Sequence, residues 1–321
     1  MNRLQVFLRW TVAVCAAASL VACGGGGGGE GGSARPTAAT GTFSTDSYKG
    51  TTDRVVDTLT ATSVATSFAM PADASNSPAW RQSDRLAALV RTAFVNLQGS
   101  RRAAAAAVEP IDEACAGGGR LTGSISYKSP DFSSVGDYVE LVAANCMDWD
   151  GVRYDGRLKV TLTAVAATSA QAELHTQNLL IAANGVTTTI NGTARVSYTQ
   201  TETKEAMRIA FDGLSATQGS QSYRWWHVLD YEDVYAGTTG PTVAFSGFVE
   251  VDGRYYQLQQ RAPFTVYSMS KSGTLDIVDA NGNRVAVRAA QERFTYTYYE
   301  AGSSTPKAGP VDGKPYAGLF Y

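Results

Sequence analysis

The chain has 321 residues, of which 44% are hydrophobic and 17% are charged, and its formal net charge at pH 7 is −2 with histidine neutral. This length accommodates one large domain or two small ones. No basic stripe runs along the sequence, and the adjacent Arg101 and Arg102 are better explained as a solvated helix face. The charge pattern therefore argues against a nucleic-acid partner.

The N-terminal segment has the pattern of an export signal. It contains Arg3 and Arg9 and no acidic residue, and residues 10–21 are apolar apart from Thr11 and Ser19. A basic stretch followed by a short apolar run is typical of a secretory signal peptide. A membrane-spanning helix needs about 20 apolar residues, and this run is shorter. Residues 1–22 are therefore predicted to be an export signal.

The tetrad Leu20-Val21-Ala22-Cys23 at the end of this run resembles the lipobox of bacterial lipoproteins. The resemblance implies cleavage before Cys23 and acylation of its thiol and amino group. An ordinary cleaved secretory signal is the alternative. In Gram-negative lipoproteins, Asp after the lipidated Cys implies retention in the inner membrane, so Gly24 implies the outer membrane, with the leaflet left open. A membrane, reached through the N-terminal lipid, is the predicted partner.

A linker is expected after Cys23. Glycine dominates residues 24–32, and Ser, Thr, Gly and Ala are frequent up to residue 52. Because glycine has no side chain to pack and high backbone entropy, residues 23–52 are predicted to be a flexible tether. Residues 53–70 fit a helix by the spacing of Val55, Val56 and Leu59 but fit a strand by their Thr content.

A clearer helical signal begins at Ser77-Pro78, an N-cap followed by proline at the first helical position. Apolar residues then recur at steps of three and four and form one stripe, which consists of Leu86, Leu89, Val90, Ala93, Phe94 and Leu97. The sequence predicts a helix over about 78–98 within a mixed N-terminal segment, residues 53–116. We expect its apolar stripe to pack against the sheet that follows.

From residue 117 to 321 the hydrophobic period changes to two, which indicates strands with one buried and one wet face. Strong hairpin dipeptides separate these strands, at Asn184-Gly185, Asp252-Gly253 and Asn281-Gly282. The sequence thus predicts a mainly β fold, an antiparallel meander of roughly ten to twelve strands with an N-terminal amphipathic helix. Because so wide a sheet cannot stay flat, we expect it to be strongly curved, either open or closed into a barrel-like form.

A diverged repeat runs through the same region. Glycine followed by two alternating apolar positions recurs at Gly123, Gly156, Gly192, Gly247 and Gly273. Return strands carry Asn or Asp near their ends, at Asn145, Asn178 and Asp212. The irregular spacing excludes a propeller or a solenoid of fixed period. This pattern resembles uncharacterised Gram-negative envelope lipoproteins in general terms, and the resemblance implies no activity.

The cysteines predict one disulfide. Cys15 would leave with the signal and Cys23 would take the lipid, so Cys115 and Cys146 remain as a pair in an oxidising compartment. A metal site is the alternative, but two cysteines cannot complete a tetrahedral shell and neither histidine lies near them.

No catalytic motif is found, and no cofactor is predicted. A Gly-x-Ser-x-Gly elbow is absent from the sequence. His175 lies in an alternating strand, and His227, beside Trp225 and Trp226, is the better catalytic candidate although packing explains it better. Glu232 and Asp233 are adjacent, so on a strand they point to opposite faces and do not form a pair.

No metal site is predicted either. Asp279 to Asn283 begins like a calcium loop, but Arg284 replaces the glycine that an EF-hand needs, and a hairpin turn is the better explanation. Three acidic residues after the Cys146 strand could supply oxygen ligands, although an ordinary loop explains them better. These are Asp148, Asp150 and Asp155.

The C-terminal third is rich in aromatic residues. Where two are adjacent on a strand, one ring is placed on each face, so some rings should meet solvent and could bind glycan, peptide or lipid. The candidate binding residues are Trp225, Trp226, Tyr255, Tyr256, Tyr298 and Tyr299. Strand propensity with cross-strand aromatic pairing is the alternative explanation.

These observations favour a non-catalytic function. The leading hypothesis is a lipid-anchored β domain of the cell envelope that binds or scaffolds, with an apolar sheet face able to hold a hydrophobic ligand. The ligand-holding version is an analogy with periplasmic lipoprotein carriers, and it is at the level of the fold alone. An outer-membrane β-barrel-like protein and an envelope hydrolase acting on glycan or peptide are the alternatives.

Overall fold

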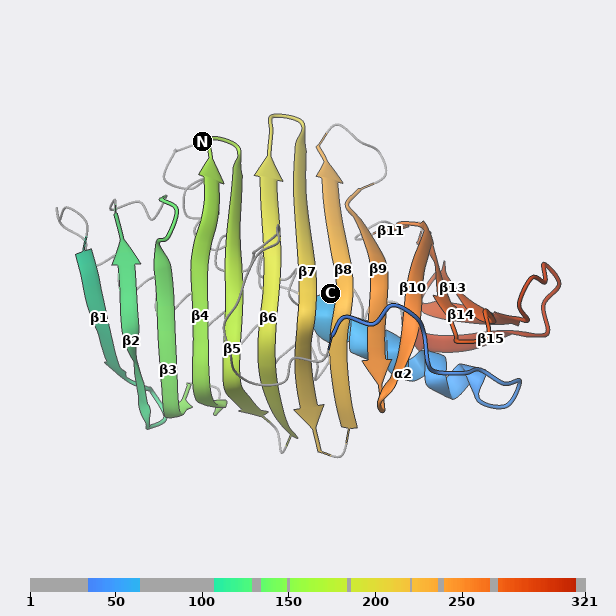
Figure 1. Cartoon of the computed structure of the whole chain (residues 1–321), viewed down its shortest axis with the longest axis horizontal. Helices are drawn as coiled ribbons and strands as arrows, with labels where there is room; N and C mark the ends of the chain where they lie inside the picture. Colours follow the sequence, from blue (N-terminus) through green and yellow to red (C-terminus); the bar gives the residue numbers. More distant parts are fainter. Residues whose placement is uncertain are drawn as a thin grey trace.

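The computed structural model describes residues 34–63, 107–128, 134–148, 151–183, 186–219, 221–235, 240–265 and 271–315. In these residues the chain forms one antiparallel sheet and one helix, α2 (Tyr48–Ser63) (Figure 1). The predicted fold class, a mainly β antiparallel meander, is confirmed. The predicted signal, Cys23 and the helix predicted over about 78–98 lie outside the described residues.

The sheet has fifteen strands among the described residues. They are β1 (Ala107–Ala114), β2 (Arg120–Tyr127), β3 (Tyr138–Met147), β4 (Arg153–Ala166), β5 (Ser169–Ala183), β6 (Val186–Gln200), β7 (Lys204–Gln218), β8 (Gln221–Val234), β9 (Thr242–Val251), β10 (Arg254–Ala262), β11 (Phe264–Thr265), β12 (Thr274–Val278), β13 (Arg284–Ala290), β14 (Arg293–Tyr299) and β15 (Ala308–Pro315).

Neighbours in the chain are neighbours in the sheet, except that β11 pairs with β9 and β12 follows β10. The order ends at β1 and β15, which do not pair with each other, so the sheet is not closed. The sheet has more strands than the predicted ten to twelve. Two of the additional strands contain proline, which made them hard to predict: β1 contains Pro110, and β15 contains Pro310 and Pro315. Proline argues against a central strand but is tolerated at a sheet edge, where both of these strands lie.

The repeated glycines mark β-bulges. Gly156 has a φ of 95°, and a Cβ built on it would lie 2.0 Å from the Asn178 carbonyl oxygen, so no other residue fits there. The partner strands change register between Ala143 and Cys146 and between Thr176 and Leu179. At these shifts Asn145 and Asn178 have φ values of 47° and 48°. The recurring glycine and asparagine therefore specify one repeated bulge rather than repeated turns.

One face of the sheet carries the hydrophobic core, and we call it the core face. On β3–β7 it presents buried apolar residues that alternate with polar residues of the opposite, polar face, and examples are Val139, Leu158, Val196 and Ile209. Ion pairs cross the polar face, such as Arg195 with Asp212. The predicted alternation of buried and wet residues is thus present along these strands.

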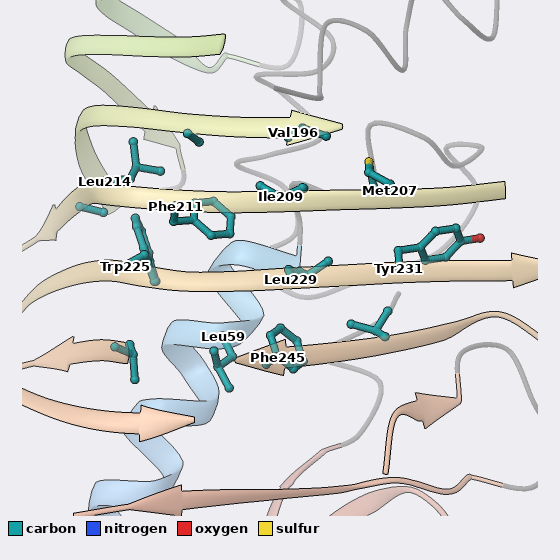
Figure 2. Close-up of a cluster of buried hydrophobic side chains, with 14 of the residues drawn as sticks. Leu59, Val196, Met207, Ile209, Phe211, Leu214, Trp225, Leu229, Tyr231 and Phe245 are labelled. Carbon is teal, nitrogen blue, oxygen red and sulfur yellow. The ribbon is translucent and has the colours of Figure 1, made fainter. Parts of the chain in front are cut away.

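Helix α2 packs on the core face beside β9, β14 and β15. Val55, Val56 and Leu59 are buried, and the Trp225 indole Nε1 donates a hydrogen bond to the Thr58 carbonyl at 3.2 Å. Figure 2 shows Leu59 and Trp225 on this side of the sheet. The ambiguity over residues 53–70 is resolved as helix up to Ser63.

The predicted tether, residues 23–52, is wrong in its C-terminal part. The backbone nitrogens of Thr40 and Gly41 donate to the Tyr255 carbonyl at 2.9 and 3.0 Å, and Phe43 is buried. Residues 48–52 belong to α2. Small and hydroxylated residues indicated a linker, but here they allow the chain to lie close against β10.

Asp279 fixes this N-terminal segment to the β12–β13 turn. One carboxylate oxygen accepts hydrogen bonds from the backbone nitrogens of Asn281 and Asn283, both at 2.9 Å. The other accepts from the Phe43 nitrogen at 2.7 Å and the Asn283 side-chain amide at 3.0 Å. The carboxylate is thus surrounded by N–H donors, as in an Asx turn rather than a calcium site.

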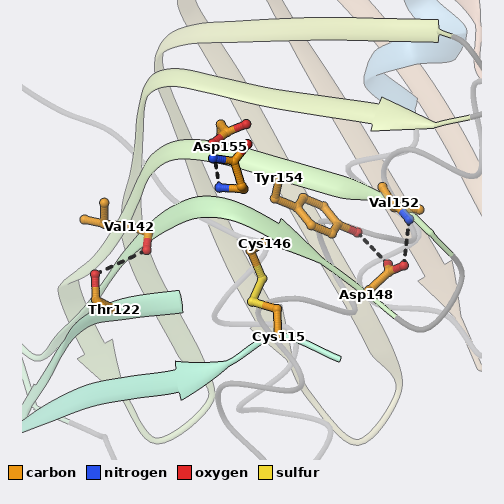
Figure 3. The surroundings of a disulfide bond; sticks show 9 residues. Cys115, Thr122, Val142, Cys146, Asp148, Val152, Tyr154 and Asp155 are labelled. Carbon is orange, nitrogen blue, oxygen red and sulfur yellow. Dashed lines mark hydrogen bonds between the residues drawn. A yellow bond between two sulfur atoms is a disulfide. The ribbon is translucent and has the colours of Figure 1, made fainter. Parts of the chain in front are cut away.

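The predicted disulfide between Cys115 and Cys146 is confirmed, with a Cα–Cα distance of 5.3 Å (Figure 3). Cys115 follows β1, and Cys146 lies in β3. Because β2 lies between these strands, the bond joins the terminal strand to a strand two positions further in.

Candidate functional site

The six predicted binding aromatics do not form an exposed surface. Five of them are at most 7% exposed, and only Tyr255 is half-buried. Tyr298 stacks on Tyr48 of α2 with ring centroids 5.6 Å apart, and Tyr256 lies 5.3 Å from Phe43. Of these rings, some of which were expected to meet solvent, only Tyr255 does so, and the other five contribute to packing, as the alternative explanation predicts.

Neither histidine lies in a catalytic arrangement. His227 is fully buried on the core face, with Phe211 and Phe245 at ring distances of 4.8 and 6.0 Å. Burial lowers the pKa of its imidazole to about 3, so the ring is neutral at pH 7. His175 is exposed on the polar face, 3.3 Å from the Thr193 hydroxyl. Since the two rings lie on opposite faces, they cannot act on the same substrate.

The acidic residues considered for calcium are bonded to protein donors. Asp148 accepts from the Val152 nitrogen at 2.9 Å and the Tyr154 hydroxyl at 3.2 Å (Figure 3). Asp155 accepts from the Asn145 nitrogen and from Arg153, both at 2.7 Å. Asp150 lies outside the described residues, and within the described part of the chain no group of three or more metal-ligating side chains occurs.

A different cluster lies on the core face where β6, β7 and β8 come to the same end of the sheet. Tyr198, Met207 and Tyr231 are directly opposite one another in one cross-strand row. Glu205 and Asp233 face each other in the next row toward the end, and Tyr235 follows β8. Figure 2 shows Met207 and Tyr231 side by side. The Tyr–acid cluster, as we name it, consists of Tyr198, Glu205, Met207, Tyr231, Asp233 and Tyr235.

Two tyrosine hydroxyls hydrogen-bond to the Glu205 carboxylate. The Tyr235 hydroxyl donates to it at 3.2 Å, and the Tyr198 hydroxyl also hydrogen-bonds to it. Burial, together with the nearby Glu205 charge, raises the pKa of the Tyr198 hydroxyl well above its usual range, so it remains a donor at neutral pH. Tyr198 and Tyr231 are buried, whereas Glu205 and Asp233 are half-buried and Tyr235 is 46% exposed. The cluster is therefore reachable from solvent.

Among the described residues, no cation pairs with the two carboxylates of the cluster. Residues directly opposite in an antiparallel ladder have Cβ atoms about 5 Å apart, and like charges there are destabilising. Lys204, the nearest cation in sequence, pairs instead with Glu232 on the polar face. Within the described residues, no ion pair involves Glu205 or Asp233. Within the part of the chain that the structure describes, the site thus combines two carboxylates that have no cation partner with three phenol groups.

Replacing Asp233 by Asn is expected to stabilise the protein. Removing one of two opposed like charges should raise the melting temperature by about 1–2 °C in low salt. The gain should disappear near 1 M salt, where the Debye length is about 3 Å. Glu232→Gln is the matched control: it removes the same charge from the neighbouring residue but breaks the Lys204 ion pair, so it should give no gain. A melting temperature lowered by Asp233→Asn would contradict the repulsion.

Glu232 and Asp233 lie on opposite faces of β8, as their adjacency predicts, but the local sequence does not reveal the opposition of Asp233 and Glu205. That opposition depends on the register of two strands, which no local motif encodes. Comparison with known proteins adds no functional residue to this cluster. The chain matches no family model, and comparisons with curated proteins and with solved structures find no match either.

Proposed function

We propose that the protein is a lipid-anchored β domain of the bacterial cell envelope, which binds a ligand or partner and does not catalyse a reaction. The single observation that carries the anchoring is the Leu20-Val21-Ala22-Cys23 tetrad at the end of a short apolar run. Two acyl groups on Cys23 are sufficient for stable membrane attachment. Gly24 in place of Asp favours the outer membrane.

The position in the chain at which the folded domain begins supports the proposed anchoring. In the described residues, the Arg35 side chain donates to the Trp226 carbonyl at 3.5 Å, and Thr40 is the first residue whose backbone hydrogen-bonds to the sheet backbone. Residues 24–39 can span at most about 55 Å. The sheet would therefore lie within that distance of the bilayer. Among the described residues, no helix is both long enough and apolar enough to cross a membrane.

The surroundings of the histidine and aspartate side chains that could act in catalysis favour binding over catalysis. His227 is neutral and enclosed by aromatic rings, and Asp148, Asp155 and Asp279 accept hydrogen bonds from protein donors. The core face, which the sequence suggests as a site for a hydrophobic ligand, is packed by the protein's own side chains around Trp225 (Figure 2).

Labelling with radioactive palmitate tests the anchor. We expect the wild-type protein to incorporate the label and the Cys23→Ser variant to lose it. Cys15→Ser is the matched control, since that cysteine lies within the predicted signal and its loss should leave labelling unchanged. Equal labelling of the Cys23→Ser variant, or none of the wild type, would refute the lipid anchor.

A further inference from the structure

We propose that residues 78–98 form a helix that lies on the core face across β2–β6, with its apolar stripe against the sheet. The inference concerns what occupies this face, so it goes beyond the proposed function and does not depend on the lipid anchor. The sequence predicts the helix and its packing against a sheet, and the described residues indicate the strands on which it packs.

The core face is buried over a greater width than α2 covers. One row of directly opposed residues crosses it from β4 to β9. At the β9 end the cover is α2, whose buried Leu59 is seen near Phe245 in Figure 2. The β4 end is equally buried, and Ala172 has only a methyl group, so a covering group must approach the sheet closely there. The residues of the row, each at most 2% exposed, are Leu162, Ala172, Val196, Ile209, Leu229 and Phe245.

The path of the chain leads over this part of the sheet. Tyr48 at the start of α2 stacks on β14, and the Thr58 carbonyl near its end accepts the hydrogen bond from Trp225 of β8. Beyond its end, the same direction leads over β7 and β6 toward β1, and Figure 1 shows no other described helix or strand over β1–β6. Because β1 begins at Ala107, residues 64–106 must connect the middle of the sheet to its far end.

The predicted helix has the length that this path requires. Neighbouring strands lie about 4.8 Å apart, so β1 and β7 are separated by about 29 Å. A helix over residues 78–98 would be about 31 Å long. Its apolar residues form a single stripe, as packing on an apolar sheet face requires.

No other stretch outside the described residues suits this position as well. Residues 1–33 consist of the predicted signal and a glycine-rich run that has few side chains to pack. The remaining stretches are at most six residues long, too short to cross five strands. Residues 78–98 are therefore the segment of the chain best suited to cover the core face.

Thiol labelling of a cysteine placed beneath the proposed helix tests the inference. In the full chain, Ala172→Cys should react with a water-soluble maleimide at least about tenfold more slowly than Glu173→Cys, its exposed neighbour on the polar face. Val90→Asp places a charge in the apolar stripe and should raise the Ala172→Cys rate about tenfold or more. Val95→Asp makes the same substitution on the opposite side of the helix and should change that rate less than about twofold. The chain without an added cysteine gives the background rate.

Ala286→Cys, buried in β13 toward the other end of the sheet, should stay slow in both backgrounds. If Val90→Asp accelerates this site too, the whole domain has opened, and the near-isosteric pair Val90→Thr and Val95→Thr replaces it with the same expected order. The proposal is overturned if the two positions have equal effects. It is also overturned if Ala172→Cys reacts as fast as Glu173→Cys, or stays slow in every variant, as under a bound hydrophobic ligand. Labelling that slows with protein concentration would indicate a second copy on this face and would overturn it as well.

Discussion

Replacing both Cys115 and Cys146 by serine is expected to lower the free energy of unfolding by about 3.5 kcal/mol, from the entropy of the loop that the bond closes. The two residues are separated by 31 positions. Beyond that entropy, the bond secures β1, which pairs only with β2 and forms one end of the sheet. Loss of the bond should therefore also loosen β1 locally.

Urea denaturation of the oxidised wild type and of the double variant measures the global effect. Hydrogen exchange measures the local one, and amides of β1 should lose more protection than those of β14. Wild-type protein reduced with dithiothreitol is the control and should match the double variant. An unchanged denaturation midpoint together with unchanged β1 protection would show that the bond contributes nothing to stability.

Replacing Asp279 by Asn is expected to lower the free energy of unfolding by about 3 kcal/mol. The buried carboxylate accepts four hydrogen bonds, two of them at the oxygen that faces the Phe43 nitrogen and the Asn283 amide. An amide in its place presents N–H donors to N–H donors on one side, and buried donors left without acceptors cost about 1–3 kcal/mol each. The N-terminal segment, held at Phe43, should detach first.

The matched control is Asp252→Asn, which makes the same change at an exposed turn residue that pairs with Arg54. Exposed ion pairs contribute about 0–1 kcal/mol, so this variant should remain close to wild type. Thermal unfolding gives the stability, and limited proteolysis near residue 40 reports detachment of the segment. Equal stability of the two variants would contradict the anchoring role of Asp279.

The fold class could be predicted because period-two alternation and hairpin dipeptides are local signals. Helix α2 could not be predicted from its own residues, since its Thr content favours a strand. In the structure Thr58 lies in the helix, where its hydroxyl donates to the Arg54 carbonyl at 2.7 Å. Burial of Val55 and Leu59 against the sheet decides the conformation, and that tertiary contact is not encoded locally.

A binding role for the aromatic residues, which the sequence leaves open beside packing, depends on one wet ring in each adjacent pair, and the pair Tyr298–Tyr299 has none. Tyr298 and Tyr299 do point to opposite faces of β14, but both faces are covered there. Tyr298 stacks on Tyr48, and the Arg284 guanidinium lies 3.8 Å from the Tyr299 ring centroid. The covering groups come from distant parts of the chain, so the strand sequence alone gives no sign of them.

The Tyr–acid cluster was missed because a bulge determines it. Gln218 pairs with Gln221 at the β7–β8 hairpin, but the register shifts between Ala210 and Leu214. Without the extra residue, Glu205 would lie opposite Val234 instead of Asp233. A shift of one residue reverses which side chains share a face, so the pairing of the two carboxylates depends on the bulge.

The positive-φ glycines and their bulges bear on how strands could be added to this sheet or removed from it. Gly123, Gly156, Gly192, Gly213 and Gly247 all have positive φ and lie on β2, β4, β6, β7 and β9, at levels that form one slanted line across the sheet. Because a β-bulge bends the strand that contains it, each hairpin contributes its own part of the bend of the sheet. Insertion or deletion of a whole hairpin would preserve that bend, and an open meander has no ring whose circumference must be kept. The architecture thus permits growth by tandem duplication, in increments of two strands.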